Sequence, residues 1–510
     1  MMANEKAKAI NVVVDQAERT KLEFFHDTQR HAYATVPVAD HNETWLIRSR
    51  DFKLWVTKTM LDAFGSAPKA FVAACIEEFE TRAICQGVRK DVFVRVGEHE
   101  GANYIDLAND HWQVVQVTAE QWHILNQPPV KFRRPIGTLE LPYPALGGSL
   151  AELRRFLNVS GGSEVLLMTW LSFAFHPHGP YPILVLLGPQ GAGKSTISKV
   201  LRALIDPSDA GLTALPRSER DLAIAATNTH LITMDNLSTI TPQFSDMLCR
   251  VATGGAFRTR KLYTDDEELI FTFQRPQIIN GIAELPERAD LLDRTVLIRP
   301  DQIPEEKRRD EKSFWRDFEE ARPRLFDSLL NAICVGLRQV DSVKLSTLPR
   351  MADFAKWGVA VERALGFAPG EFLAAYRENI QHASDAALEA SPIAYTAHLF
   401  LRRQGAWSGP ALKLLKALND FAVEIENGRR VPNIARKNPR WPKSAQQLSA
   451  EIARIEPNLA KLGIQVERGR TNSGRFISLR LVTHAPDDGD AAENTASSAY
   501  LAKAKVVGAA

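Results

Sequence analysis

The chain has little cysteine, and its four cysteines are not arranged as a scaffold. Cys75, Cys85, Cys249 and Cys334 show neither a C-x-x-C pair nor the spacing of zinc ligands among the 510 residues. This pattern excludes a disulfide framework and a cysteine-bound structural metal, and it is typical of a reducing compartment. We therefore expect a cytoplasmic protein with buried thiols.

Long apolar runs and net charge are also lacking. The run at residues 166–175 is interrupted by Thr169 and Ser172, short of the roughly 20 apolar residues that span a bilayer. The opening MMANEKAKAINVVV ends at Asp15 without a cleavage signature, so we expect no secretion signal and no membrane partner. Lys and Arg number 63 and Asp and Glu 61, so the net charge of +2 excludes no partner, and only the clustering of charges is informative.

The apolar sequence, 45% of the chain, is enough for about three cores. Helices are expected at 52–64 and 67–83, two strands around a glycine turn at 91–110, and a domain boundary in the proline-rich segment 128–144. The predicted parts are an N-terminal α+β domain of unknown role (1–145), an α/β core with alternating strands and helices (148–300), a helical lid or bridge (301–385), helices followed by a strand pair (390–482) and a disordered tail (483–510).

The most specific pattern is YPILVLLGPQGAGKST at residues 181–196. A strand-like run leads into a loop that fits the phosphate-loop (P-loop) pattern G-x-x-x-x-G-K-S/T at every fixed position, and a helix-like run follows. The glycines let backbone N–H groups approach phosphates, Lys194 neutralises the β and γ oxygens, and the Ser195 hydroxyl ligates Mg²⁺. We predict that ATP and Mg²⁺ bind here, through Gly188, Pro189, Gln190, Gly191, Ala192, Gly193, Lys194, Ser195 and Thr196.

The next apolar strand ends in Asp235 and Asn236. An acidic residue after a strand beside a phosphate loop is the position that holds Mg²⁺, although Asp-Asn is also a common turn. Many such ATPases place a glutamate where Asn236 stands, and an amide cannot accept the proton of the attacking water. Either Asn236 orients the water, or a carboxylate such as Glu219 or Asp221 supplies the base, and the sequence leaves both open.

Two later residues complete the predicted catalytic set. The strand at 278–279 ends in Asn280, a polar group placed to lie between the loop and the metal acid and to sense the γ-phosphate, although Asn-Gly is also an ordinary turn pair. Arg294 precedes another strand, and we expect its guanidinium to be exposed at an edge of the domain. The predicted catalytic residues are Lys194, Asp235, Asn236, Asn280 and Arg294, with Ser195 and Asp235 as metal ligands.

Between the metal acid and Asn280 the sequence predicts a β-hairpin that carries basic and aromatic side chains. Gly254 and Gly255 begin a bend, and alternating residues follow it up to an acidic turn at 265–268. On such a hairpin cations follow a phosphate backbone and aromatic rings stack on bases; the alternative is a solvated hairpin with no ligand. The candidate DNA contacts are Arg258, Arg260, Lys261 and Tyr263.

Five segments, taken in order, resemble the AAA+ ATPases of superfamily-three helicase type from phages, plasmids and integrative elements, including the helicase part of poxvirus-like primase-helicases. They are GPQGAGKST, TMDNLS, SDMLCRVATGGAFRTRKLY, IING and DLLDR. The resemblance covers residues 150–300, and TMDNLS departs from the usual paired-acid ending. It implies a hexameric ring with ATP at subunit interfaces, Asn280 as first sensor and Arg294 acting in trans. It also implies that the segment 254–263 grips single-stranded DNA in the ring channel.

Basic residues cluster near the C-terminal end. The stretch GRRVPNIARKNPRWPKS is followed by a helix-like run at 444–463 and by two strand-like runs around a glycine turn. Helix, turn and hairpin are the order of a winged helix, which contacts duplex DNA through its phosphates, although such a domain also binds proteins. The candidate contacts are Arg436, Lys437, Arg440, Lys443, Arg468, Arg470 and Arg475.

Two functions of different classes follow from these patterns. One is an ATP-driven, ring-shaped DNA helicase or translocase that replicates a phage or mobile element, which the basic hairpin favours. The other is a DNA-binding, nucleotide-dependent switch with slow ATPase, such as an initiator, loader or defence regulator, which Asn236 favours. A small-molecule kinase is disfavoured because the additional domains offer no evident acceptor pocket.

Overall fold

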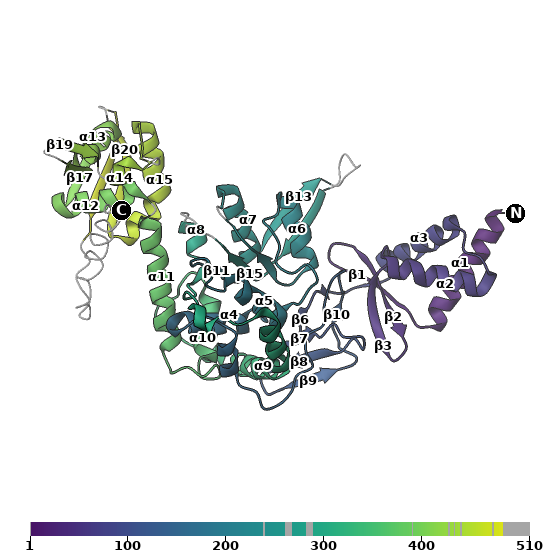
Figure 1. Ribbon diagram of the computed structural model, residues 1–510. Coiled ribbons are helices and arrows are strands. Elements are labelled where there is room, and N and C mark those ends of the chain that lie inside the picture. The colour runs from purple at the N-terminus through teal and green to yellow at the C-terminus, as the bar shows by residue number, and fades with distance from the viewer. Residues whose placement is uncertain are drawn as a thin grey trace. The chain divides into compact units, whose positions relative to one another are not determined.

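The computed structural model describes residues 2–237, 240–260, 268–281, 289–389, 391–426, 429–432, 434–438, 441–471 and 474–482. These residues form two compact units, Met1–Ala383 and Ser384–Ala510 (Figure 1). Among the predicted residues, Lys261, Tyr263, Arg440 and the tail at 483–510 lie outside the described part of the chain, as do the side chains of Arg258 and Arg260.

The first unit begins with helices packed on a small sheet. Its elements are α1 (Met2–Arg19), β1 (Glu23–His26), β2 (Ala32–Val38), β3 (His41–Leu46), α2 (Arg50–Phe64), α3 (Lys69–Cys85) and β4 (Val88–Arg89). The strand order is β3-β2-β1-β4, and Phe52 and Phe79 lie in the core between the helices and the sheet. Helix α2 begins after Ser49, whose side chain accepts a hydrogen bond from the Phe52 N–H. Helices α2 and α3 lie where the sequence predicts helices, at 52–64 and 67–83.

Two more sheets follow. The strands β5 (Val92–Phe93) and β10 (Lys131–Phe132) form a parallel pair, and β6 (Val96–His99), β7 (Ala102–Asp106), β8 (Val114–Val117) and β9 (Trp122–Leu125) form a four-stranded sheet. Strands β6 to β9 pair antiparallel in chain order, and the β6–β7 hairpin is the strand pair predicted at 91–110. Ile105 and Val115 share one hydrophobic core with Leu184, which lies far downstream. The predicted boundary near 145 therefore does not coincide with a change of core.

A buried ion pair also crosses that boundary. The Arg95 Nε donates to Asp206 Oδ1 at 2.9 Å, and the two side chains are 1% and 6% exposed. Asp206 accepts two more hydrogen bonds, from the backbone N–H groups of His230 and Leu231 at 2.9 and 3.1 Å. Because each buried charge has partners, the network joins residues on both sides of position 145 into one folded body.

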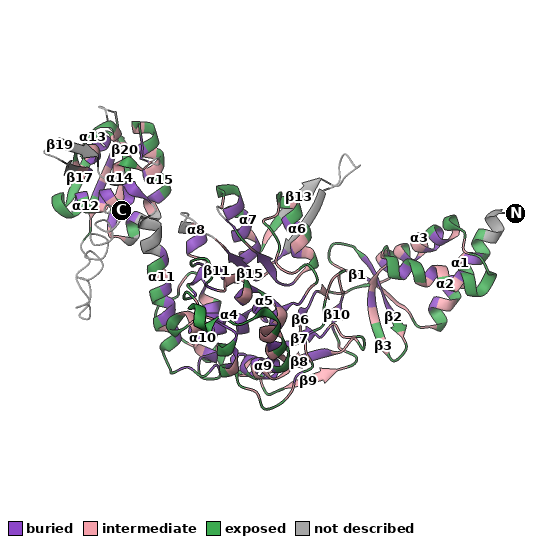
Figure 2. Ribbon diagram, in the orientation of Figure 1, coloured by how far each residue is buried: buried purple, intermediate pink, exposed green. Residues whose placement is uncertain are grey.

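The centre of the unit is a parallel sheet with helices around it. The elements of this part of the chain are η1 (Leu150–Arg155), α4 (Gly161–Phe173), β11 (Ile183–Leu186), α5 (Lys194–Ile205), α6 (Glu219–Asn228), β12 (Ile232–Met234), α7 (Pro242–Thr253), β13 (Gly255–Arg260), β14 (Glu268–Phe273), β15 (Gln277–Asn280), α8 (Ala289–Leu292) and β16 (Thr295–Ile298). The parallel order is β12-β15-β11-β16, and every residue of these strands is buried (Figure 2). The carboxyl ends of all four strands meet at one edge.

Helices complete the first unit, in agreement with the helical pattern of residues 301–385. They are η2 (Glu305–Lys307), α9 (Glu311–Gln339), η3 (Val340–Ser342), α10 (Ala352–Val361) and α11 (Glu371–Glu389), which extends past the unit boundary. Phe318 and Phe326 of α9 and Trp357 of α10 lie in the large core, where the Trp357 Nε1 donates to Ser172 Oγ at 2.9 Å. None of the described helices has both the length and the apolar character that a membrane span requires.

The second unit combines helices with a small antiparallel sheet. Its elements are α12 (Pro392–Gln404), β17 (Ala406–Gly409), α13 (Ala411–Phe421), β18 (Val423–Glu426), β19 (Arg429–Pro432), α14 (Ile434–Lys437), α15 (Ala445–Lys461), β20 (Ile464–Thr471) and β21 (Gly474–Leu481). The main sheet has the order β17-β21-β20. Leu448, Ile452, Ile455 and Leu459 place one face of α15 in the core, with the spacing of a helix.

Candidate functional site

The glycine-rich loop, residues 188–193, connects the carboxyl end of β11 to the first turn of α5. Gly191 and Gly193 have positive φ angles of 83° and 78°, in the left-handed region that favours glycine. Gly193 is also the N-cap of α5 and offers no side chain to the helix terminus. The loop therefore turns by backbone conformation alone and leaves the start of α5 open to a ligand.

The polar groups of this loop are those that bind anions. Among the described residues, the backbone N–H groups of Lys194, Ser195 and Thr196 have no hydrogen-bond partner. The Lys194 Nζ donates to the carbonyl oxygens of Gly188 and Pro189, at 2.7 and 2.9 Å. A helix N-terminus with free N–H groups and an ammonium beside it is the arrangement that holds a phosphate.

A hydroxyl and a carboxylate meet next to the loop. Asp235 follows the last residue of β12, and its Oδ1 accepts a hydrogen bond from Ser195 Oγ at 3.2 Å. An alcohol oxygen and a carboxylate oxygen at this distance are suited to Mg²⁺, which prefers oxygen ligands and keeps several waters. The two residues that the sequence predicts as metal ligands thus lie in contact and fit that ion.

Asn280 lies between the loop and the acidic strand end, because β15 lies between β11 and β12. Its side chain is 1% exposed. The Oδ1 accepts the Asn236 N–H at 3.1 Å, and the Nδ2 donates to Ser198 Oγ at 2.9 Å. Ser198 in turn donates to the Lys194 carbonyl at 3.1 Å. A continuous chain of hydrogen bonds therefore links the backbone after Asp235 to the first turn of α5.

The backbone at Asn236 has an unusual conformation. Its φ is 57°, a left-handed value, and Gly281 next to it has a φ of 94°. A Cβ on Gly281 would lie only 2.6 Å from the Asn236 Cα, so only glycine fits there. Asparagine tolerates the left-handed region better than most residues, which gives a conformational reason for an amide at 236.

Glu219 and Asp221, the alternative bases, both lie in the first turn of α6. Glu219 forms an ion pair with Arg250. The Asp221 Oδ2 accepts a hydrogen bond from the Ser218 hydroxyl at 2.8 Å, and the Asp221 backbone N–H donates to Ser218 Oγ at 3.1 Å. Both carboxylates are thus engaged with neighbours of their own.

Arg294 differs from its prediction. Its side chain is 13% exposed, because the guanidinium pairs with the Asp290 carboxylate and donates to the Asp290 carbonyl at 2.7 Å. Within the described residues its Nε has no hydrogen-bond partner. Asp290 also pairs with Arg350, at 2.9 Å. The expectation of an exposed guanidinium is therefore wrong for the single chain.

Two residues near the loop were missed by sequence reasoning. The Asn158 Nδ2 donates to the Ala192 carbonyl at 3.3 Å. The Arg308 Nη2 lies 3.9 Å from the position that a Cβ on Gly191 would occupy, and the side chain is 54% exposed and pairs with Glu305 at 3.8 Å. No motif marks either residue; the only signal is the basic run KRR at 307–309.

The predicted DNA contacts fall into two groups. Strands β13 and β14 pair antiparallel, from Gly255 opposite Phe273 to Arg260 opposite Glu268, so the predicted hairpin strands exist. In the second unit Arg470 and Arg475 lie directly opposite each other on β20 and β21, and both are exposed.

The other predicted DNA contacts of the second unit differ in whether their side chains bond to neighbouring residues. Lys437 and Lys443 are exposed, whereas Arg436 donates to the Asn419 carbonyl at 3.2 Å and Arg468 pairs with Glu456. Trp441, at the centre of the basic stretch, is 7% exposed, and its Nε1 donates to Asn419 Oδ1 at 2.8 Å. This tryptophan is therefore a core residue.

The fold is α/β, with a parallel sheet at its centre. Residues 149–386 match a family model described as actinomycete integrative conjugative element replication protein, and residues 393–497 match the AICE RepA C-terminal domain. Over these residues, about two thirds of the chain, the protein is similar to a replication protein of a mobile element. No protein with a curated description matches the chain.

Solved structures align with the chain at low scores. An apo structure of the NrS-1 C-terminal region covers 93% of this chain and 99% of its own, with 11% identity and a TM-score of 0.41. A second apo structure of that region (305–718) gives 11% identity and 0.40 over 93% and 99%. A JCV helicase with a bound thiazolopyridine compound covers 43% of this chain and 66% of its own, with 13% identity and 0.21. Scores this low do not establish a shared fold.

Proposed function

We propose that this protein is an ATP-hydrolysing DNA helicase or translocase that replicates a mobile element. The observation that carries the proposal is the 3.2 Å contact between Ser195, at the start of α5, and Asp235, at the end of β12. It supports a magnesium–nucleotide site because it joins the glycine-rich loop to a carboxylate at the carboxyl edge of the sheet, where ligands of such sheets bind. The match to mobile-element replication proteins supports the biological setting.

In this proposal the loop binds the triphosphate. The free N–H groups at residues 194–196 and the Lys194 ammonium hold the β and γ oxygens. Arg308, in the same chain, adds a second cation beside Gly191. Bound Mg²⁺, on Ser195 and Asp235, would supply charge neutralisation of the phosphates.

The Asn280 chain of hydrogen bonds positions these groups. It fixes the backbone after Asp235 relative to α5, so that the ligands of the metal and of the phosphates keep one spacing. Asn236 orients the attacking water through its amide, because Glu219 and Asp221 are engaged elsewhere.

The ring is part of the proposal as well. Arg294 acts on the nucleotide of a neighbouring subunit in a hexamer, which requires that assembly release part of its pairing with Asp290. The β13–β14 hairpin contacts single-stranded DNA in the channel, and the second unit acts as a winged helix whose β20–β21 strands contact duplex phosphates. A cytoplasmic location remains a prediction from the sequence.

A DNA-binding switch with slow ATPase is the second candidate, and Asn236 is the observation that favours it. The left-handed backbone at Asn236 suits asparagine and would be strained with glutamate, so this position does not favour a glutamate as the catalytic base. Such a protein would form ATP-dependent complexes on DNA without displacing a strand.

Steady-state ATP hydrolysis with and without single-stranded DNA tests the proposal, with Lys194→Ala as the blank. A motor requires turnover that DNA stimulates and strand displacement that stops when hydrolysis stops. Slow turnover that is indifferent to DNA would reject the motor in favour of the switch.

A further inference from the structure

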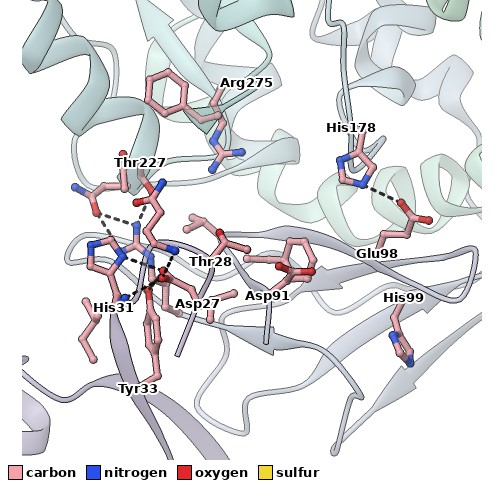
Figure 3. A pocket seen from close by; sticks show the side chains of 18 of the residues that line it. Asp27, Thr28, His31, Tyr33, Asp91, Glu98, His99, His178, Thr227 and Arg275 are labelled. Atoms are coloured by element: carbon pink, nitrogen blue, oxygen red, sulfur yellow. Dashed lines mark hydrogen bonds and ion pairs between the residues drawn. The ribbon is translucent and has the colours of Figure 1, made fainter. Parts of the chain in front are cut away.

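One cavity formed by the described residues contains no residue of the glycine-rich loop. It has a volume of about 810 Å³, within the range of sites for small ligands. Its lining comes from the turn after β1, from residues 91–100, and from segments that flank α6 and β14 (Figure 3). The cavity therefore lies where the N-terminal sheets meet the α/β part, inside the first unit.

Two guanidinium groups line this cavity without a carboxylate partner. Arg133 donates to Asn228 Oδ1 at 3.1 and 3.2 Å, and Arg275 donates to the carbonyls of Ala226 and Gln274 at 2.9 and 3.0 Å. All of these acceptors are neutral, and neither arginine forms an ion pair within the described residues. Burial lowers the pKa of both arginines, and the charge of Arg133 adds to the effect at Arg275. Two such cations favour an anionic ligand.

Within the described residues the carboxylates of the cavity form no ion pair with these arginines, although the charge of Asp27 partly offsets the lowering of the Arg133 pKa by burial. Asp27 accepts hydrogen bonds from the backbone N–H groups of Gln29 and His31, at 2.8 and 2.9 Å, and from the His31 Nδ1 at 2.9 Å. Glu98 pairs with His178 at 3.0 Å. Figure 3 shows these two groups on opposite sides of the cavity, each with its own partner. Asp91 and Glu100 are exposed.

Aromatic rings complete the lining. Tyr33 and Phe273 are 3% and 8% exposed, and Phe93 packs against Phe132 with 6.1 Å between ring centroids. Phe273 is also the last residue of β14, whose partner strand carries the predicted DNA contacts. Aromatic faces for a base and guanidinium groups for a phosphate are the combination that binds one nucleotide unit.

We propose that this cavity binds one nucleotide unit, with its phosphate held by Arg133 and Arg275. The unit belongs either to a nucleic-acid strand or to a free nucleotide, which share this chemistry. The site lies outside the glycine-rich loop and therefore goes beyond the proposed function.

The test uses the full chain with Lys194→Ala, so that the cavity is measured without the loop ammonium. Two probes are titrated: a labelled oligodeoxythymidine of roughly 20 nucleotides, longer than one site, by fluorescence anisotropy, and dTMP by calorimetry. Arg133→Gln and Arg275→Gln are each expected to lower the affinity for at least one probe about tenfold or more, because each removes one charged hydrogen-bond partner of the phosphate. The outcome does not depend on ATP hydrolysis, so it is separate from a failure of the proposed function.

The matched control is Arg48→Gln, because this exposed arginine pairs with Glu80 and does not line the cavity. Thr28→Trp is a second test. Thr28 is exposed on the cavity rim, so tryptophan there fills space without entering the core.

The outcomes separate the two sources. Weaker binding of dTMP identifies a free-nucleotide site, and weaker binding of the oligonucleotide alone identifies a strand site. If the arginines only bind the carbonyls at the end of α6, their variants melt earlier but keep both affinities, which overturns the proposal. Should the arginine variants fail to fold, unchanged binding of both probes by Thr28→Trp overturns it.

Discussion

The loop edge of the parallel sheet and the β20–β21 pair of the second unit both carry groups suited to phosphate, but they hold them differently. At the loop edge, Asn280 and Ser198 are buried and connect the strand end to the helix through hydrogen bonds. On β20 and β21, Arg470 and Arg475 are exposed and lie opposite each other, an arrangement of like charges that costs stability in the absence of a ligand. Side chains held in one geometry suit chemistry on a small ligand, whereas exposed cations suit the long, uniform phosphate backbone of a nucleic acid.

The largest effect is expected at the loop. Lys194→Ala should lower ATP turnover at least about a hundred-fold, because it removes the cation beside the transferred phosphate. Lys199→Ala is the matched control, since Lys199 lies on the same helix, is half exposed and forms an ion pair with Glu311 at 3.8 Å. Steady-state hydrolysis measures both, and equal losses in the two variants would contradict a specific role for Lys194.

Acid should destabilise the buried region beside β12 through His230. Burial lowers the pKa of His230 from 6.5 to about 4, and the charge of Arg275 adds to the shift. The unfolded chain takes up this proton near pH 6.5 and the folded chain only near 4. The free energy of unfolding therefore keeps the full contribution of neutral His230 above pH 6.5, and this contribution decreases toward pH 4, by up to about 3 kcal/mol.

Denaturant midpoints measured from pH 7 to pH 4 check this shift. His230→Gln keeps an amide donor for the Ala174 carbonyl and does not titrate, so its midpoint should fall less with pH than that of the parent. Parallel curves for the two proteins would exclude His230 as the source of the acid sensitivity.

The hydrogen-bond chain at the loop edge should show a moderate effect. Asn280→Ala leaves the Asn236 N–H and the Ser198 hydroxyl without their partner, so we expect ATP turnover to fall about tenfold. Ser198→Ala removes only the far end of the chain and should cost less. If Ser198→Ala were the more damaging change, the chain would act through α5 rather than through the backbone at Asn236.

The smallest effect is expected on the exposed strands. The double change Arg470→Gln and Arg475→Gln should weaken duplex DNA binding about tenfold at moderate salt and reduce the salt slope by about 2. Its melting temperature should not fall, because the change relieves repulsion between like charges. Arg403→Gln is the control, because Arg403 is an exposed residue in the last turn of α12. An unchanged salt slope would remove these arginines from the phosphate interface.

The sequence predicts the loop edge well because its features are local. A strand, a glycine loop and a helix follow one another within residues 181–205, and the order of the later strands places Asp235 and Asn280 at the same edge. The burial of Arg294 also had a local signal, since Asp290 precedes it by four residues, a spacing that favours pairing on a helix.

Other features depend on contacts between distant segments and leave no local pattern. Asn158 reaches the loop from 34 positions away, and Arg133 contacts Asn228 across 95. The cavity beside α6 arises only when these segments fold together. Trp441 lies within a basic stretch of the sequence and yet is buried, so the composition of a segment does not decide the burial of each of its side chains.

The ion pair between Arg95 and Asp206 limits where this protein can be shortened. The family match begins at residue 149, yet the cation that neutralises Asp206 lies 111 positions earlier in the chain. A shortened protein that started at the match would keep a buried carboxylate without the guanidinium that donates a hydrogen bond to it, and would lose Ile105 and Val115 from the core. The segment that relatives share and the segment that folds on its own thus start at different residues.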